Sequence, residues 1–136
     1  MEVFIIKIKV KGYLENITEN QKDLIDTNAI QNSNIISYVL ENTKYKIITE
    51  KNKITILREN EEFSHGMIFE ENKTNKSEYY LKKENYSLEF NILTTKLNIN
   101  KNKIDITYKI IESENIYNYV LESSDILWAL KENYKL

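Results

Sequence analysis

Two polar side chains in the middle of the chain could form a binding or catalytic site. Arg58 is the only arginine among nineteen basic residues, and His65 is the only histidine. A guanidinium offers a planar, bidentate fork to an anion, and an imidazole can act as a base near neutral pH. Arg58 shares its strand face with Ile54 and Ile56, and His65 shares its face with other apolar residues. The alternation therefore predicts that His65 points toward the interior of a barrel and that Arg58 points inward or lies at the barrel mouth.

Each of these residues also has a purely structural interpretation. His65 can be a core histidine that is hydrogen-bonded to a neighbour. Arg58 can pack its stem on Phe63 and bind a glutamate or a carbonyl of the Glu59–Glu62 loop. Because an unpaired buried charge is costly, Arg58 must bind a carboxylate, a carbonyl, water or the acidic group of a ligand. If the Glu59–Glu62 loop closes a hairpin, Arg58 lies opposite Phe63 and diagonal to His65.

Aromatic and apolar residues near this pair are candidates for lining a cavity. The chain has ten tyrosines, which combine apolar surface with a polar tip, although tyrosine is also a normal strand residue. Tyr79 and Tyr108 are the tyrosines that we expect to face inward, because each alternates with small or apolar residues. The candidate ligand-binding residues are thus Arg58, His65, Phe63, Met67, Tyr79 and Tyr108.

Composition excludes many other kinds of chemistry. The chain has no cysteine, so a disulfide framework, a thiolate metal site and a cysteine nucleophile are ruled out. The two glycines, Gly12 and Gly66, are too few for a phosphate-binding loop or a nucleophile elbow. A formal charge of −2 gives no reason to expect a nucleic-acid partner. No apolar run approaches the ~20 residues of a membrane span, and we expect a cytoplasmic protein without catalytic residues, metal or cofactor.

The elements that must position the candidate site are predicted to be strands. A length of 136 residues predicts a single domain over residues 1–136. Turn-rich segments at intervals of roughly ten residues separate alternating stretches, which is typical of a sandwich or barrel. The predicted strands are Met1–Val10, Leu24–Ile30, Ile35–Leu40, Thr43–Thr49, Lys53–Arg58, Phe63–Phe69, Ser77–Lys82, Tyr86–Ile99, Lys103–Ile111 and Ile116–Leu121.

Three features of these strands carry further predictions. In Tyr86–Ile99 the apolar face switches between Ile92 and Leu93, which predicts a β-bulge there. With proline absent and glycine scarce, asparagine is expected to occupy the left-handed turn positions. At the C-terminus, Ile126–Lys131 is interpreted as a strand, with a helix over Ile126–Tyr134 as the alternative, and Trp128 as barrel packing.

Between Tyr45 and Val120 the sequence resembles the YwiB-like family of small bacterial proteins. The matching segments are Ile54–Arg58, His65–Phe69, Ser77–Tyr80, Leu88–Leu97 and Ile104–Tyr108. The resemblance implies a calycin (lipocalin-like) β-barrel and supplies no catalytic or binding residue.

These observations together predict an all-β, single-domain, closed or nearly closed antiparallel barrel of about eight to ten strands. The function that we expect is non-catalytic binding of a small apolar or amphipathic molecule inside the barrel. The alternative is a structural or protein-interaction module whose interior is filled by side chains. The sequence leaves the ligand and the oligomeric state open.

Overall fold

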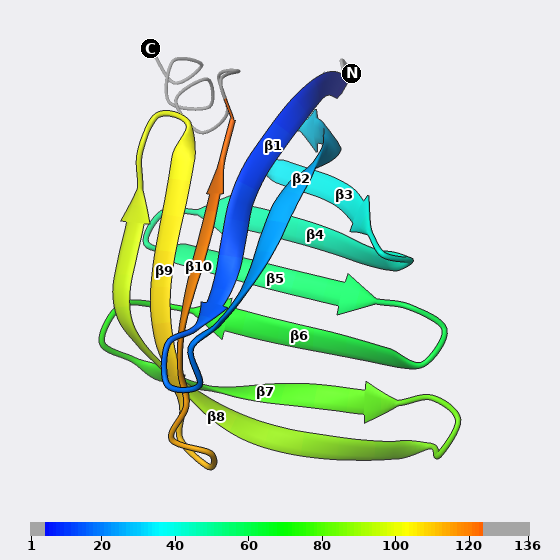
Figure 1. The fold of residues 1–136 in the computed structure, drawn as a ribbon, viewed down its shortest axis with the longest axis vertical. Coiled ribbons are helices and arrows are strands. Elements are labelled where there is room, and N and C mark those ends of the chain that lie inside the picture. Colours follow the sequence, from blue (N-terminus) through cyan, green and yellow to red (C-terminus); the bar gives the residue numbers. More distant parts are fainter. Residues whose placement is uncertain (1–4, 124–136) are drawn as a thin grey trace.

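Ten antiparallel strands form one sheet that closes into a barrel (Figure 1). The computed structural model describes residues 5–123, and this part of the chain contains no helix. Each strand pairs with the strands before and after it, and β1 pairs with β10 to close the barrel. The strands are β1 (Ile5–Asn16), β2 (Gln21–Asn32), β3 (Ile35–Leu40), β4 (Thr43–Glu50), β5 (Lys53–Glu59), β6 (Phe63–Phe69), β7 (Thr74–Leu81), β8 (Tyr86–Ile99), β9 (Lys103–Ile110) and β10 (Ile116–Glu122). The predicted all-β barrel is confirmed.

The strands lie in two layers that cross each other. In Figure 1, β1, β2, β9 and β10 run upright, whereas β4 to β7 run across the view. The ends of β4 to β8 that carry the β5–β6 and β7–β8 turns extend beyond the upright strands. The two layers cross because β8 bends from one layer into the other: it pairs with β7 in its first half and with β9 in its second half.

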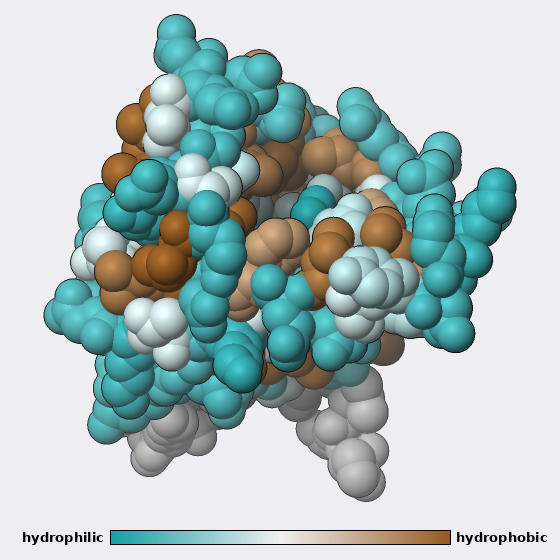
Figure 2. Space-filling model, turned by 90° about the horizontal axis from the view of Figure 1, so that it is seen from below, coloured by the Kyte–Doolittle hydropathy of each residue, from teal (hydrophilic) through white to brown (hydrophobic). Residues whose placement is uncertain are grey.

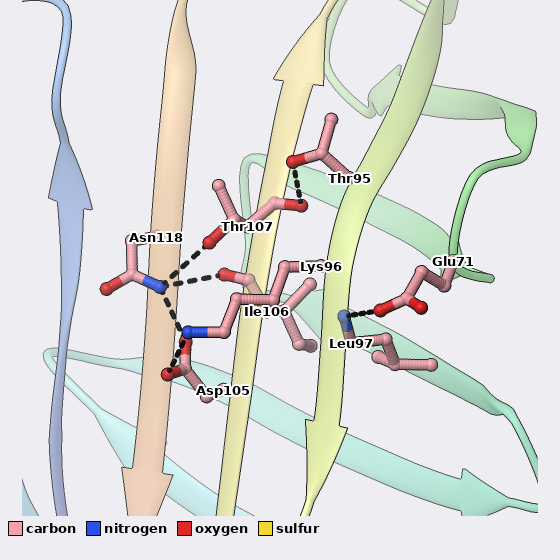
Figure 3. A network of polar contacts seen from close by, with 8 residues as sticks. All are labelled: Glu71, Thr95, Lys96, Leu97, Asp105, Ile106, Thr107 and Asn118. Atoms are coloured by element: carbon pink, nitrogen blue, oxygen red, sulfur yellow. Dashed lines mark hydrogen bonds and ion pairs between the residues drawn. The ribbon is translucent and has the colours of Figure 1, made fainter.

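The bend of β8 is produced by a bulge at Thr95. Thr94 pairs with Tyr108 and Lys96 pairs with Thr107, so Thr95 has no counterpart on β9. Figure 3 shows the surrounding contacts: the Thr95 hydroxyl donates to the Thr107 carbonyl, and Asn118 donates to Asp105, Thr107 and the Ile106 carbonyl. The bulge was predicted between Ile92 and Leu93, but it lies at Thr95. Ile92 and Thr94 are both buried, so the inward face continues through a polar residue before it switches.

Carboxylates satisfy backbone groups of β8 where its pairing ends. The first half of β8 pairs with β7 as far as Leu93, and the second half pairs with β9 from Ile92 onward. Glu112 accepts hydrogen bonds from the backbone and side-chain amides of Asn91. Glu71 accepts a hydrogen bond of 2.8 Å from the Leu97 amide (Figure 3). Each half of the strand thus has a carboxylate where a neighbouring strand is missing.

Apolar side chains from all strands except β7 fill the barrel. The buried members are Ile8, Val10, Ile25, Ala29, Ile36, Tyr38, Ile47, Ile54, Ile56, Met67, Phe69, Ile92, Ile104, Ile106, Tyr108, Tyr119 and Leu121. On β1 the lysines alternate with these residues and remain exposed, as the period-two pattern predicted.

Asparagine supplies most of the left-handed turn positions. Among residues 5–123, eight residues other than glycine have positive φ, namely Asn20, Ser33, Glu41, Asn42, Asn52, Asn72, Asn85 and Glu114, and neither glycine does. Asparagine tolerates this backbone conformation better than most residues that carry a side chain. The prediction that asparagine replaces glycine in turns is therefore confirmed.

The sequence underestimated the strands near the N-terminus. β1 continues to Asn16, and β2 covers Gln21–Asn32, where only Leu24–Ile30 was predicted. The first four residues of β2 are all exposed, so they show no alternation between apolar and polar side chains. The predictions for Ile126–Lys131 and Trp128 lie outside the described residues.

Gly12 permits the close approach of β1 to β10. It pairs with Leu121, and a Cβ atom at Gly12 would lie 1.8 Å from the Val120 carbonyl oxygen. Backbone atoms in a ladder cannot move away easily, so a side chain at this position must displace one strand. A Cβ atom at Gly66, by contrast, would meet only the flexible end of the Leu57 side chain at 3.3 Å.

We expect Gly12→Ala to lower the free energy of unfolding by about 3 kcal/mol or more, because the new methyl group overpacks against backbone. Gly66→Ala is the matched control and should change it by no more than about 1 kcal/mol. Urea unfolding monitored by circular dichroism measures both. Similar losses for the two variants would contradict the role of Gly12 in closure.

Candidate functional site

Arg58 and His65 lie in a row of side chains that crosses five strands on the inner face. The cross-strand pairs run in order from β3 to β7, and each residue pairs directly with the next. Residues paired directly in this way are in side-chain contact range. We call this set the inner row: Tyr38, Tyr45, Arg58, His65 and Tyr79.

The position of Arg58 in this row corrects the predicted register. Arg58 pairs with His65, not with Phe63, because β5 continues to Glu59, which pairs with Ser64. The side chain of Asn60 stabilises the shorter turn by accepting hydrogen bonds from the amides of Glu62 and Phe63. The two candidates are therefore closer than the diagonal arrangement expected from the sequence.

A chain of hydrogen bonds fixes the imidazole of His65. Arg58 donates from Nε to His65 Nδ1 over 3.1 Å, and His65 Nε2 lies 2.7 Å from Ser77 Oγ. Ser77 Oγ in turn donates to the Gly66 carbonyl oxygen over 2.6 Å. Because Nδ1 accepts, the proton of the neutral ring lies on Nε2 and is donated to Ser77. All three hydrogen bonds thus run in the same direction, from Arg58 to the Gly66 carbonyl, and bonds aligned in this way strengthen one another.

The serine and histidine of this chain are electrostatically unsuited to nucleophilic catalysis. Burial, and secondarily the positive charge of Arg58, lowers the pKa of His65 from 6.5 to about 4. In a catalytic triad a carboxylate supports the protonated histidine, whereas here the third group is a cation. Ser77 is also buried and donates its own proton to a carbonyl. The arrangement favours the structural interpretation of His65 as a hydrogen-bonded core residue.

Aromatic rings surround the guanidinium of Arg58. Its Cζ atom lies 5.0 Å from the ring centre of Phe63 and 5.8 Å from that of Tyr79. Phe63 and Tyr79 stack on each other at 4.8 Å, and the His65 ring lies 5.0 Å from that of Tyr79. Cation–π attraction therefore holds the guanidinium against this pair of rings. Tyr79 faces inward and Tyr80 binds Asn85 on the outside, so the structure resolves which of these adjacent tyrosines faces the interior.

Arg58 has few polar partners for a half-buried cation. Among residues 5–123 the ion pairs involve Lys73, Lys82 and Lys96. Within the same residues, the bond from Nε to His65 is the only hydrogen bond of the Arg58 side chain. The carboxylates of the Glu59–Glu62 loop do not bind it, which removes one of the structural alternatives. The two terminal nitrogens of the fork remain available to an acceptor.

Tyr108 lies deeper in the barrel than the other aromatic candidates. It is buried, packs at 4.9 Å from the Phe69 ring and stacks on Tyr117. Burial raises the pKa of the Tyr108 hydroxyl well above its ordinary value, and the charge of Arg58 opposes this rise. Arg58 therefore lies near enough to influence Tyr108, whereas Met67 belongs to the core.

Sequence reasoning missed three members of the site. Ser77 binds His65, and its inward position beside Tyr79 was the available signal. Tyr38 and Tyr45 stack on each other at 4.8 Å, and Tyr38 forms a 2.9 Å hydrogen bond with Tyr119. Strand alternation shows on which face of the sheet Tyr38 and Tyr45 lie, but only the strand register shows that they belong to the same row as Arg58.

Burial decreases along the strands toward the β5–β6 and β7–β8 turns. On β6, Phe69 is fully buried, Met67 and His65 are about nine-tenths buried, and Phe63 is half-buried. On β8, Ile92 is buried, Phe90 is half-buried and Leu88 is exposed. The core thus fills one end of these strands, while the other end exposes apolar side chains. We call this end the open end: Arg58, Phe63, Tyr79, Leu81, Leu88 and Phe90.

A groove of about 1410 Å³ lies on the opposite face of the same strands. Glu78 and Tyr80 line it and the intervening Tyr79 does not, so at β7 the groove contacts the outward side chains. Arg58 and His65 also line it, whereas Phe63, Met67, Tyr79 and Tyr108 do not. Figure 2 shows a hollowed surface in which hydrophobic atoms are framed by hydrophilic ones.

Residues 5–123 contain no group of three or more His, Cys, Asp or Glu side chains that could hold a metal ion. This part of the chain also has no helix with the length and apolar character needed to cross a bilayer.

Comparison with known proteins supports the fold. No protein-family model matches the chain, and no curated protein matches its sequence. The crystal structure of the ywiB protein from Bacillus subtilis is similar, with a TM-score of 0.65 and 15% sequence identity. The similarity covers 90% of this chain and 94% of that one. It agrees with the predicted YwiB-like fold, while the calycin classification and the cytoplasmic location stay predictions.

The depressed pKa of His65 makes stability depend on pH. The unfolded chain takes up a proton at His65 near pH 6.5, but the folded protein does so only near pH 4. Acidification from pH 7 to pH 4 therefore favours the unfolded state, and this residue should contribute a loss of about 1–3 kcal/mol. His65→Gln removes the titrating group, so its free energy of unfolding should fall less over the same range. Equal losses in both proteins, measured by urea unfolding at each pH, would show that His65 is not the responsible group.

Proposed function

We propose that this protein binds a small amphipathic molecule with an acidic group, without catalysis, at the open end of the barrel. The observation that carries the proposal is the state of Arg58. Its guanidinium is half-buried against two aromatic rings, and no carboxylate among residues 5–123 pairs with it. Burial of a cation without a counter-ion is costly, and an acidic ligand would remove this cost.

The hydrogen-bond chain would prepare Arg58 for such a ligand. His65 and Ser77 hold the Nε side of the guanidinium, so its planar fork is fixed before binding. A carboxylate, sulfonate or phosphate can then accept two parallel hydrogen bonds from the terminal nitrogens. Fixing the donor in advance lowers the entropy lost on binding.

The apolar part of the ligand would contact the aromatic and aliphatic side chains of the open end. Phe63, Tyr79, Leu81 and Phe90 are half-buried, and Leu88 is 37% exposed. Covering these side chains would bury apolar area, which stabilises a complex by roughly 25 cal/mol per Å² before binding costs are counted. The chemistry favours a compact acid with an aromatic or aliphatic body.

The alternative function is that of a structural or protein-interaction module. It is favoured by the contiguous core, whose members come from nine of the ten strands and include the tyrosine pair Tyr38 and Tyr119. A filled interior leaves a ligand only the open end, where it would contact Arg58. The two functions therefore differ in whether Arg58 binds an anion.

A matched pair of fluorescent probes tests the proposal. 8-Anilino-1-naphthalenesulfonate carries an anionic group, and N-phenyl-1-naphthylamine has nearly the same apolar body without it. The wild type should bind the anionic probe more tightly. Arg58→Lys keeps the charge but loses the planar fork, and it should weaken binding of the anionic probe about tenfold, or ~1.4 kcal/mol, while binding of the neutral probe stays the same.

Lys51→Gln is the control for loss of a cation in an exposed turn, and it should leave both affinities unchanged. Melting temperatures of all variants separate binding from stability, since Arg58→Lys also changes the bond to His65. If the wild type binds both probes equally, or if Arg58→Lys binds the anionic probe as the wild type does, Arg58 is structural and the alternative function is favoured.

A further inference from the structure

The groove on the outer face has a surface that differs from the site at the open end. Its outward residues form two rows that cross the strands, in which lysines alternate with apolar and small side chains. We call it the lysine groove: Lys7, Lys9, Ile30, Val39, Lys44, Lys46, Leu57 and Gly66, together with other residues of the same strands. Direct pairing places Lys7 beside Ile30 and Lys46 beside Leu57, so basic and apolar groups are adjacent.

The lysine groove is positively charged although the chain carries a formal charge of −2. Four lysines line it, and within residues 5–123 none of them forms an ion pair. Of its two glutamates, Glu59 is already paired with Lys82 at 2.6 Å, which leaves Glu78. The unpaired charge therefore favours an acidic partner.

The apolar side chains of the lysine groove are exposed. Ile30 is 47% exposed, Val39 is 55% and Leu57 is 41%. Gly66 lies in the same row as Leu57 and has no side chain to fill the space above the strand. Exposed apolar side chains that lie among unpaired lysines favour a partner surface that offers apolar and acidic groups together.

We propose that the lysine groove binds an amphipathic helix of a partner protein, with acidic residues flanking its apolar face. The volume of about 1410 Å³ exceeds the ~300–1000 Å³ of small-molecule sites. The helix would place apolar residues at i, i+3, i+4 and i+7 against Ile30, Val39 and Leu57. This inference is independent of the function proposed for Arg58.

Two synthetic peptides provide the probe. One has 14 residues, with leucines at i, i+3, i+4 and i+7 and glutamates on both flanks, and the other has the same composition in a scrambled order. Fluorescence anisotropy should show binding of the amphipathic peptide and at least tenfold weaker binding of the scrambled one. Lys44→Glu combined with Lys46→Glu should weaken binding of the amphipathic peptide about tenfold or more, and Leu57→Ser should do the same at unchanged charge.

The matched control is Lys51→Glu combined with Lys101→Glu, two exposed turn lysines outside the groove, which should not change the affinity. Leu88→Ser, at the open end and outside the lysine groove, should also bind the peptide as the wild type does, so failure of either proposal can be recognised separately. The inference is overturned if neither peptide binds, if the scrambled peptide binds equally well, or if the two charge-reversal pairs have the same effect. It is also overturned if the full-length protein binds phosphatidylglycerol vesicles and not the peptide, since a membrane surface is then the occupant.

Discussion

The barrel depends on β8 taking part in two pairings at once. Its first half completes the layer of crossing strands with β7, and its second half completes the upright layer with β9. The bulge at Thr95 makes this possible because one extra residue bends the strand and returns the following side chains to the core. Glu71 and Glu112 then satisfy amides that lack a strand partner. Without this bend the ends of β5 to β8 would not project beyond the upright layer to form an open end.

The electrostatics of the candidate site follow from one cation in an aromatic environment. Burial, with the charge of Arg58 as the second cause, lowers the pKa of His65, and His65 in turn forms a hydrogen bond with Ser77. The charge of Arg58 also opposes the rise in pKa of Tyr108. The same residues in a hydrolase would need a carboxylate in place of the guanidinium. With a guanidinium in that place, the histidine of the serine–histidine pair holds the Nε side of Arg58 by a hydrogen bond.

Sequence patterns predicted the strands far better than the contacts between them. Phe63–Phe69 and Tyr86–Ile99 were predicted with their observed bounds, since alternation and turn residues are local signals. The predicted partner of Arg58 was wrong because the register depends on the turn at Asn60. The hydrogen bonds of the Asn60 side chain cannot be recognised from a pattern of polar and apolar residues. The bulge was misplaced because Thr94 is buried yet polar. Tyr38 and Tyr45 became recognisable only when pairing across the strands brought them to Arg58, whereas the inward position of Ser77 was visible in the alternation of its strand.

The closing pair of the barrel joins strands from opposite ends of the described chain. Lys11 pairs with Glu122, and the ladder between β1 and β10 continues as far as Asn16 with Tyr117. During synthesis, β1 therefore leaves the ribosome long before its second partner exists, and its edge stays unpaired while the other strands form. Lysines at positions 7, 9 and 11 alternate with its apolar residues, which disfavours pairing with another nascent chain. We therefore expect the lysines of β1 to disfavour edge-to-edge pairing while this strand awaits β10, as well as to shape a surface of the finished barrel.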